Sequence, residues 1–294
     1  MKIAILSRGP QLYSTQALFE AAQLRGHEPR VIDHLYCQMI MEDKALKVRY
    51  GNEILDHFDA VIPRIGASVT FHGAALIRQF ELMGVFSAMG SDALLRSRDK
   101  LRCLQLLGSA GVGIPKTAFS NYIDAPKDLI EQVGGIPVVI KLLKGTHGLG
   151  VILGKDASTS ESILEAFNRV HEKVLVQEFI GESNGEDIRA LVVNGEIVAS
   201  MKRKAVAGEF RSNLHRGATA IHVKLDSKEE AAALKAVEIL GLSIAGVDIL
   251  QSQRGPLVLE VKPSPGIEGI TKTTGVDVAD KIISFIESQV NINK

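Results

Sequence analysis

Two acidic residues on a short hairpin near the end of the chain could hold a divalent cation. The apolar runs AGVDIL (245–250) and PLVLEVK (256–262) flank the polar turn QSQRG, a pattern that predicts an antiparallel hairpin. Residues two apart share one face of a strand, so Glu260 and Lys262 point the same way, and Asp248 on the partner strand lies within reach. Carboxylate oxygens suit Mg²⁺. A solvent-facing polar stripe is the alternative, but the apolar neighbours argue against it because buried carboxylates need partners.

A glycine-rich loop earlier in the chain could bind phosphate. Gly145, Gly148 and Gly150 fall within six positions of KGTHGLG, between two strand patterns. Glycine lets the backbone approach a phosphate closely, and successive N–H groups can cradle its oxygens. A flexible turn explains the glycines equally well. Lys141, inside the apolar run VVIKLL (138–143), favours phosphate, because a buried lysine needs an anionic partner. A lysine that snorkels to water at a sheet edge is the alternative.

Two further segments could complete a nucleotide site. The run VLVQEFI (174–180) could hold an adenine, with Glu178 accepting hydrogen bonds from ribose hydroxyls, although many core strands end in a charged residue. The segment 200–218 is strongly basic, a composition that more often marks a solvated face. Its place between the glycine loop and the acidic hairpin favours anion binding instead. His215 in this segment lacks companions at ligand spacing, so we interpret it as structural or as a phosphate donor, not as a metal ligand.

Composition excludes several broad classes. Lys plus Arg and Asp plus Glu both number 34, and this balance argues against a general nucleic-acid binder. Cys37 and Cys103 cannot form a disulfide framework and are expected to be reduced packing residues. The first apolar run is too short for a signal peptide, and no run is long enough to cross a bilayer. A cytoplasmic location is therefore expected, without membrane or direct nucleic-acid partners.

The elements that must position these residues fall into two patterns. Up to residue 83, strands alternate with helices, which predicts an α/β unit with a parallel sheet. The first turn, SRGPQLYS, lacks the three-glycine dinucleotide fingerprint, so an oxidoreductase is not expected. One amphipathic helix is predicted over 92–110. The second half has strands without long helices between them, which predicts an antiparallel α+β unit.

Four longer motifs resemble the RimK family of glutamate ligases in the ATP-grasp superfamily, and the resemblance covers essentially the whole chain. They are VIPRIG (61–66), RSRDKLR (96–102), FRSNLHRG (210–217), and the ending LVLEV, SPGIEGI and KTTG. The resemblance implies an ATP-grasp fold with an N-terminal Rossmann-like (pre-ATP-grasp) domain over 1–95. It further implies a central ATP-grasp subdomain with a glycine flap over 96–180 and a C-terminal subdomain with the metal hairpin over 181–294.

The resemblance also assigns roles to single residues. It implies Mg²⁺ or Mn²⁺ on Asp248 and Glu260, and a less specific role for Arg203 in steadying an acyl-phosphate. The residues expected to contact ATP are Lys100, Lys141, Gly145, Gly148, Gly150, Glu178, Phe179, Asp187, Arg211, Ser212 and Asn213.

One position departs from the family pattern. The family has an asparagine two residues after the metal-binding glutamate, where its oxygen binds a second metal, but this chain has Lys262. Lysine has only donors and a positive charge, so it cannot bind a cation in its usual form. Either the ammonium replaces one metal ion and assists catalysis, or ATP binds with weak turnover or none. The first reading is preferred because the other site residues match.

The reaction implied is ATP-dependent ligation of an acid to an amino acid through an acyl-phosphate. The resemblance suggests glutamate addition to the C-terminus of a small-subunit ribosomal protein (the sixth), synthesis of poly-α-glutamate, and a homotetramer. A related ligase acting on a carrier protein or a coenzyme tail is the nearest alternative. A non-catalytic ATP-binding regulator is the alternative from another class.

Overall fold

The computed structural model describes residues 1–145 and 150–292. The first part of the chain contains a parallel sheet in the order β2-β1-β6-β7, which confirms the predicted α/β unit. Strand β6 and all but the first residue of β1 are buried. The elements of this part are β1 (Lys2–Leu6), α1 (Tyr13–Leu24), β2 (Glu28–Ile32), β6 (Ala60–Pro63), α2 (Thr70–Leu82), β7 (Phe86–Ser87) and α3 (Ser91–Arg98).

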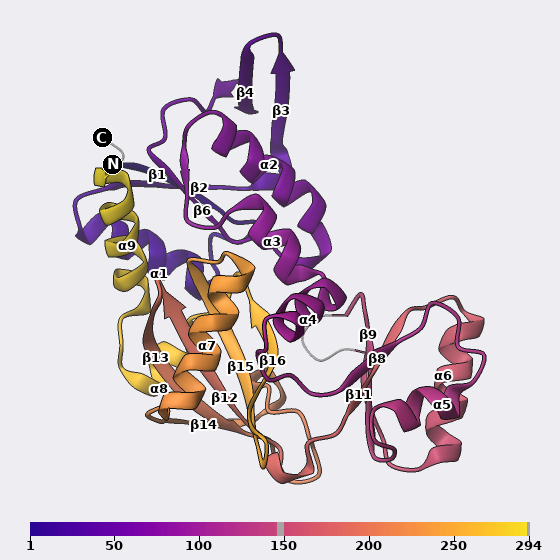
Figure 1. The fold of residues 1–294 in the computed structure, drawn as a ribbon. Coiled ribbons are helices and arrows are strands. Elements are labelled where there is room, and N and C mark those ends of the chain that lie inside the picture. The colour runs from indigo at the N-terminus through magenta and orange to yellow at the C-terminus, as the bar shows by residue number, and fades with distance from the viewer. Residues whose placement is uncertain (146–149, 293–294) are drawn as a thin grey trace.

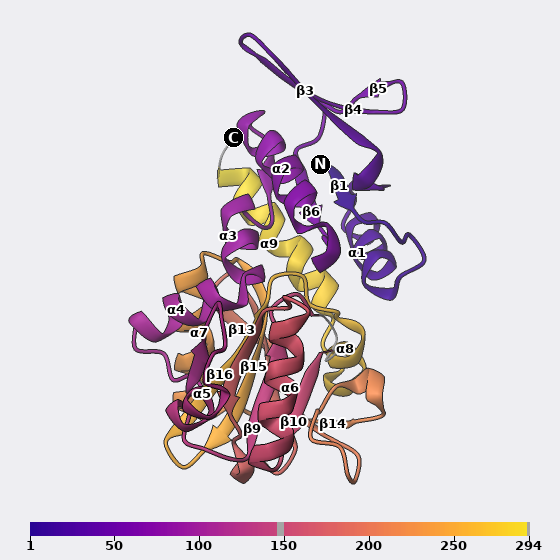
Figure 2. The same cartoon turned by 90° about the vertical axis from the view of Figure 1, so that its right-hand side faces the viewer.

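A small antiparallel sheet that the sequence analysis did not anticipate projects from this unit (Figures 1 and 2). It contains β3 (Cys37–Glu42), β4 (Ala45–Tyr50) and β5 (Glu53–Ile54). Lys44 in the β3–β4 turn has a φ of 59°, a conformation that non-glycine residues rarely adopt. This turn has no glycine to mark it in the sequence, so the hairpin was not predicted.

The helix predicted over 92–110 is wrong as a single element. The structure has α3 (Ser91–Arg98) and α4 (Lys100–Ser109), separated by Asp99 in an extended conformation. The Asp99 side chain accepts a hydrogen bond from the backbone N–H of Arg102, so it caps a new helix. The break places Lys100 at the first position of α4, where its side chain can reach the glycine loop.

The central part forms a separate lobe with its own core (Figure 1). Its sheet has the order β10-β9-β11-β8, and all three pairings are antiparallel. The elements are β8 (Thr117–Phe119), α5 (Pro126–Gln132), β9 (Val138–Leu142), β10 (Val151–Gly154), α6 (Ala157–Arg169) and β11 (Val174–Glu178). We refer to residues 117–178 as the central lobe.

The last part has a five-stranded antiparallel sheet in the order β14-β13-β12-β15-β16, which confirms the predicted change of pattern. Its strands are β12 (Glu186–Val193), β13 (Glu196–Lys204), β14 (Thr219–His222), β15 (Ile244–Ser252) and β16 (Gly255–Lys262). The helices are α7 (Ser227–Leu240), α8 (Glu268–Thr274) and α9 (Val278–Ile292).

The first and last parts share their hydrophobic cores. One core joins Leu6 of β1 to Val258 of β16, and another joins Leu18 of α1 to Ile282 of α9. Arg25, just after α1, forms ion pairs with two acids of α9. Figure 1 shows α9 beside α1, with both ends of the described chain close together. The N-terminal and C-terminal parts are therefore one packed body.

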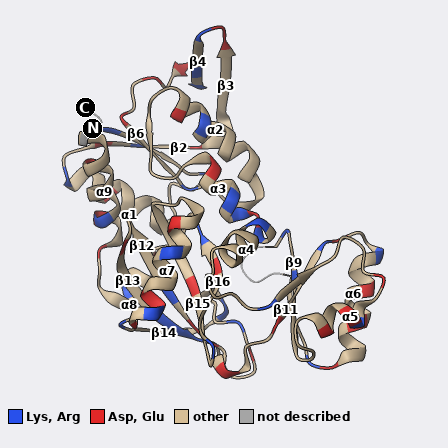
Figure 3. Cartoon of the chain, in the orientation of Figure 1, with Lys and Arg blue, Asp and Glu red and all other residues tan. Residues whose placement is uncertain are grey.

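Cys37 and Cys103 are free and buried, as expected. Figure 3 shows both signs of charge distributed over the N-terminal, central and C-terminal parts. Within 1–145 and 150–292, no helix combines the length and the apolar character that crossing a membrane requires.

Candidate active site

The two predicted metal ligands face each other on the C-terminal hairpin. Asp248 on β15 and Glu260 on β16 are direct cross-strand partners, and the register shifts immediately after Asp248. Asp248 is 3% exposed, whereas 48% of the Glu260 side chain is exposed. The hairpin thus presents one carboxylate from within the sheet and one at its open side.

Two arginines hold Asp248 in its ionised form. Arg189, opposite it on β12, donates from Nε to Oδ1 and from Nη2 to Oδ2, both at 2.7 Å. Nη2 of Arg203 lies 3.2 Å from Oδ1. Burial alone would raise the pKa of Asp248, but the charges of Arg189 and Arg203 outweigh it and hold that pKa well below its ordinary value. Asp248 therefore offers a fixed anion to a cation.

Lys262 lies beside both acids, as its position on the strand predicted. Its Nζ is 2.5 Å from Oε2 of Glu260 and 4.0 Å from Oδ2 of Asp248. Burial would raise the pKa of Glu260, but the charge and hydrogen bond of Lys262 together with the charge of Arg189 keep that pKa below its usual value. Among the described residues, no three His, Cys, Asp or Glu side chains gather into a metal site. The donor set suits one Mg²⁺ that completes its shell with water and phosphate oxygens.

Asp187 and Arg203 lie inside the sheet and pair with each other. They are register partners on β12 and β13, and the side chains are 5% and 2% exposed. Arg203 donates from Nε at 2.7 Å and from Nη2 at 2.5 Å to the two oxygens of Asp187. Burial raises the pKa of Asp187 against the charge of Arg203, and the neighbouring Asp248 adds to the rise. Both residues thus belong to the network that supports Asp248, and their predicted contacts with substrate stay predictions.

Lys141 projects from β9 of the central lobe onto a polar residue that the sequence analysis missed. Its Nζ donates to Oε1 of Gln177 at 2.5 Å, and Nε2 of Gln177 donates to Thr117 at 2.8 Å. Burial lowers the pKa of Lys141 to about 8, with Glu260 opposing and the charges of Lys100 and Lys262 adding to the fall. Three lysines from β9, α4 and β16 therefore act on one another electrostatically around Glu260.

The start of the glycine loop is held by Lys100. Its Nζ donates to the carbonyl oxygens of Leu143 at 2.8 Å and Gly145 at 2.9 Å. At the other end, Gly150 has a φ of +70°, and a β-carbon there would lie 2.4 Å from Cδ1 of Leu142. Glycine is therefore required at 150 for both conformation and space. The predicted phosphate contact at Gly148 lies outside the described residues.

The predicted adenosine contacts lie at the end of β11. The carboxylate of Glu178 accepts from the N–H of Lys116 at 2.6 Å and forms an ion pair with Arg254 of the β15–β16 turn. Neither partner was anticipated, because the pairing joins segments far apart in the chain. Phe179 meets Phe210 edge to face, with centroids 6.4 Å apart. The strand end thereby contacts the basic segment.

The basic segment contacts the first residue of β10, directly after the glycine loop. Arg211 donates to both oxygens of Glu209, at 2.9 and 2.7 Å, and its Nη1 donates to the carbonyl of Val151 at 3.3 Å. These bonds lower the pKa of Glu209 to about 2. Ser212 is buried and helps to lower the pKa of Asp187 against the effect of burial. Asn213 immediately precedes a short 3₁₀ turn, Leu214–Arg216. The predicted residues at 211–213 thus border both the loop and the carboxylate network.

Comparison with known proteins identifies the family. Residues 97–286 match the model of the RimK-like ATP-grasp domain, and residues 1–94 match the RimK pre-ATP-grasp domain. The chain belongs to the RimK family. A probable α-L-glutamate ligase of Syntrophotalea carbinolica is 56% identical over 287 residues, which cover 98% of this chain and 95% of that protein. One from Vibrio atlanticus is 55% identical over 293 residues, covering 100% and 97%.

Solved structures agree with the ATP-grasp fold of this RimK-family chain. A RimK domain ATP-grasp protein from Sphaerobacter thermophilus has a TM-score of 0.73 at 23% identity, covering 98% of this chain and all of that one. The ligase PsnB, solved with a minimal precursor, Mg and ADP, has a TM-score of 0.75 at 19% identity, covering 99% and 98%. The predicted fold is confirmed, and the chain is an ATP-dependent ligase. The domain boundaries and individual site residues stay predictions.

Proposed function

We propose that this RimK-family ligase adds glutamate to a peptide carboxylate, using ATP and one divalent cation. The observation that carries the proposal is the cross-strand pair of Asp248 and Glu260, with Lys262 beside both acids and with the charge of Glu260 acting on Lys100 and Lys141. Three ammonium groups and two carboxylates suit a triphosphate with a bound metal ion. Glutamate as the amino acid is supported by the names of the full-length relatives.

The reaction has two bond-forming steps. An oxygen of the acceptor carboxylate attacks the γ-phosphorus of ATP, the bond from that phosphorus to the bridging oxygen breaks, and ADP leaves. The glutamate amine then attacks the carbonyl carbon of the acyl-phosphate. The C–O bond to phosphate breaks, the nitrogen loses a proton, and an amide remains. Lys100 and Lys141 would lower the energy of the charge on the transferring phosphoryl group.

A divalent cation on Asp248 and Glu260 would neutralise phosphate oxygens during this transfer. Arg189 and Arg203 would hold Asp248 in place for that role, since between them they contact both of its oxygens. Lys262 would supply the second positive charge in place of a second metal ion. Mg²⁺ is the proposed ion, with Mn²⁺ as a substitute of similar ligand preference.

The proposed acceptor is an acidic C-terminus. The C-terminus of the sixth small-subunit ribosomal protein and a growing poly-α-glutamate chain are the two candidates. A carrier protein or coenzyme tail would use the same ATP site with a different acceptor. Lys262 at the second-metal position is the observation that would favour a ligase with weak turnover. The proposed assembly is a homotetramer in the cytoplasm.

A mass-spectrometric assay tests the proposal. The protein is incubated with ATP, Mg²⁺, glutamate and either the ribosomal protein or glutamate alone, and products are scanned for added glutamyl units. Glu260→Gln should abolish the products. Glu131→Gln is the matched control, because Glu131 is an exposed acid on α5 that pairs with Lys127. Products in neither acceptor reaction, together with no ADP release, would contradict the proposed function.

A further inference from the structure

Three arginines surround one short loop at the end of the N-terminal sheet. Arg8 follows β1, Arg64 follows β6, and Arg98 ends α3. Arg98 donates from Nη2 to the carbonyl oxygen of Ile65 at 2.7 Å. The Arg8 guanidinium lies against Gly66, where a β-carbon would be 3.0 Å from its Nη2. We call Arg8, Arg64 and Arg98 the arginine cluster.

The arginine cluster lies where the sheet changes direction. In the order β2-β1-β6-β7, β2 lies on one side of β1 and β6 lies on its other side, so the direction of winding reverses at β1. Arg8 and Arg64 therefore follow the carboxyl ends of adjacent parallel strands at the switch point. Open α/β sheets bind ligands in the crevice at such a point.

The arginine cluster has an unbalanced charge. Within the described ranges, none of its members forms an ion pair with a carboxylate at 4.0 Å or less. Nε of Arg98 is buried without a hydrogen-bond partner in that part of the structure. Burial lowers the pKa of Arg64 to about 10, and the nearby charge of Arg98 adds to the fall. A bound anion would relieve both effects.

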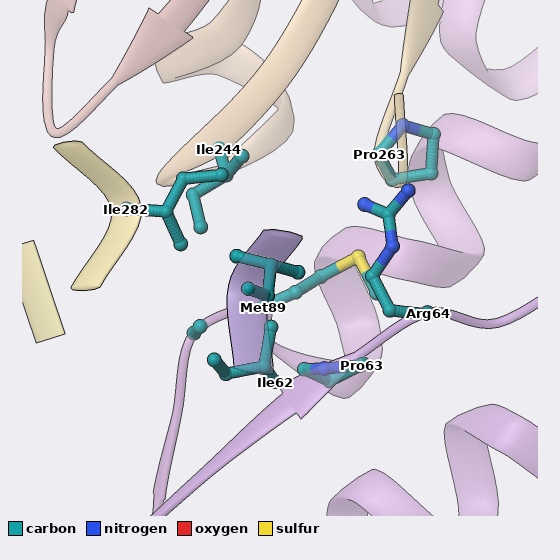
Figure 4. A pocket seen from close by; sticks show the side chains of 9 residues that line it. Ile62, Pro63, Arg64, Met89, Ile244, Pro263 and Ile282 are labelled. Carbon is teal, nitrogen blue, oxygen red and sulfur yellow. The ribbon is translucent and has the colours of Figure 1, made fainter. Parts of the chain in front are cut away.

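The arginine cluster also touches the catalytic hairpin. Arg64 donates from Nη2 to the carbonyl of Pro265 at 2.7 Å, three residues beyond Lys262. The charge of Arg98 interacts with Glu260. Figure 4 shows Arg64 extending toward Pro263 at the rim of a cavity of about 10 Å³. That cavity holds at most one water, so a substrate carboxylate would not bind inside it.

From these contacts we infer that the arginine cluster binds the non-reacting carboxylate of a glutamyl substrate. The inference rests on the proposed glutamate ligase activity. Guanidinium groups match carboxylates through paired N–H donors, and the cluster adjoins the site of phosphoryl transfer. The carboxylate could belong to the incoming glutamate or to a glutamyl residue at the acceptor terminus. The shared chemistry is a side-chain carboxylate that glutamine lacks.

Arg8→Ala tests the inference with little structural disturbance, since Arg8 is exposed. We expect the KM of one glutamyl substrate to rise about 10- to 100-fold, with the KM of ATP unchanged. Discrimination between that substrate and its glutaminyl analogue should fall by a similar factor. Glutamate against glutamine, and acceptors ending in Glu against Gln, are assayed separately, so the responding pair names the source of the carboxylate. Unchanged KM and discrimination in both pairs would overturn the inference.

Arg78→Ala is the matched control, because Arg78 is an exposed arginine on α2 that pairs with Asp92. It should change neither KM nor discrimination. Calorimetric titration with glutamate and with N-acetylglutamate separates the inference from the proposed function, because it needs no turnover. We expect at least one ligand to bind the unmodified protein and to bind Arg8→Ala about tenfold more weakly or worse. If neither binding is weakened, the arginine cluster does not bind carboxylates, whatever the ligase assay gives.

Discussion

Nζ of Lys262 lies 2.5 Å from Oε2 of Glu260, its neighbour on the same face of β16. This contact places an ammonium group where the RimK family is expected to have an oxygen ligand. An ammonium neutralises one carboxylate charge, as a metal ion would, but it contacts neighbouring oxygens only as a hydrogen-bond donor and cannot coordinate them or bind a metal ion. The relationship therefore bears on how many metal ions the enzyme uses.

Lys262→Asn should change the metal dependence. With the ammonium removed and an amide oxygen supplied, we expect two Mg²⁺ or Mn²⁺ ions per bound nucleotide instead of one. The measurement is Mn²⁺ binding stoichiometry in the presence of ADP, alongside the Mg²⁺ dependence of the rate. Lys262→Met, which removes the charge without adding a ligand, should retain one ion and lose about 10²-fold in kcat. An unchanged stoichiometry in Lys262→Asn would show that Lys262 does not occupy the second-metal position.

Arg203→Leu should destabilise the fold. The substitution leaves Asp187 buried without its bidentate partner and removes one of the three cations that lie within 4.0 Å of Asp248. We expect a loss of about 3–5 kcal/mol in the free energy of unfolding, measured by urea unfolding followed by circular dichroism. The double variant Asp187→Leu/Arg203→Leu should recover part of the loss. Arg78→Leu, at an exposed pair, should stay within about 0.5 kcal/mol of the original protein. A loss of that small size in Arg203→Leu would contradict a supporting role.

The pH dependence of ATP capture should report Lys141. Its pKa in the free protein is about 8 because of burial, so the ammonium is charged below that pH and neutral above it. Since only the charged form attracts phosphate, kcat/KM for ATP should fall above pH 8, approaching about tenfold per unit. Lys141→Arg should remove this inflection, as arginine stays charged. An inflection that persists in Lys141→Arg belongs to another group. Lys127→Arg, at an exposed lysine of α5 in the central lobe, is the control.

Gly150→Ala should impair the β9–β10 connection. An alanine at φ +70° costs about 1–2 kcal/mol, and its β-carbon would approach Cδ1 of Leu142 to 2.4 Å. We expect a lower melting temperature and a KM for ATP raised about tenfold, since a misplaced loop end forfeits about one hydrogen bond to a charged group. Adding Leu142→Ala should relieve the contact but not the backbone strain, so recovery should be partial. Full recovery would assign the defect to crowding alone.

The acidic hairpin was predictable because its information is local. The polar turn QSQRG and the alternation on β16 place Glu260 and Lys262 on one face opposite Asp248, and the pairing agrees. The parallel sheet followed in the same way from alternating strand and helix patterns. Local periodicity is sufficient wherever the partners are joined by a short turn.

Contacts between distant segments were not predictable. Glu178 meets Arg254 across 76 residues, and that pairing depends on how the central lobe sits against the C-terminal sheet. The break at Asp99 was missed because the surrounding residues favour a helix, and only the capping bond to Arg102 separates α3 from α4. The burial of Asp187 likewise depends on the sheet and on Ser212 of a distant loop.

The division of the hydrophobic cores determines which part of the enzyme can rotate. The first and last thirds of the chain pack against each other along α1 and α9. Separating them would therefore expose their shared hydrophobic core to water. The central lobe has a hydrophobic core of its own, so it can rotate without exposing that core to water. We therefore expect the central lobe to move as a rigid body about hinges near residues 117 and 178 when nucleotide enters and product leaves. This motion would change the distance between Lys141 in the lobe and Asp248 in the rest of the enzyme.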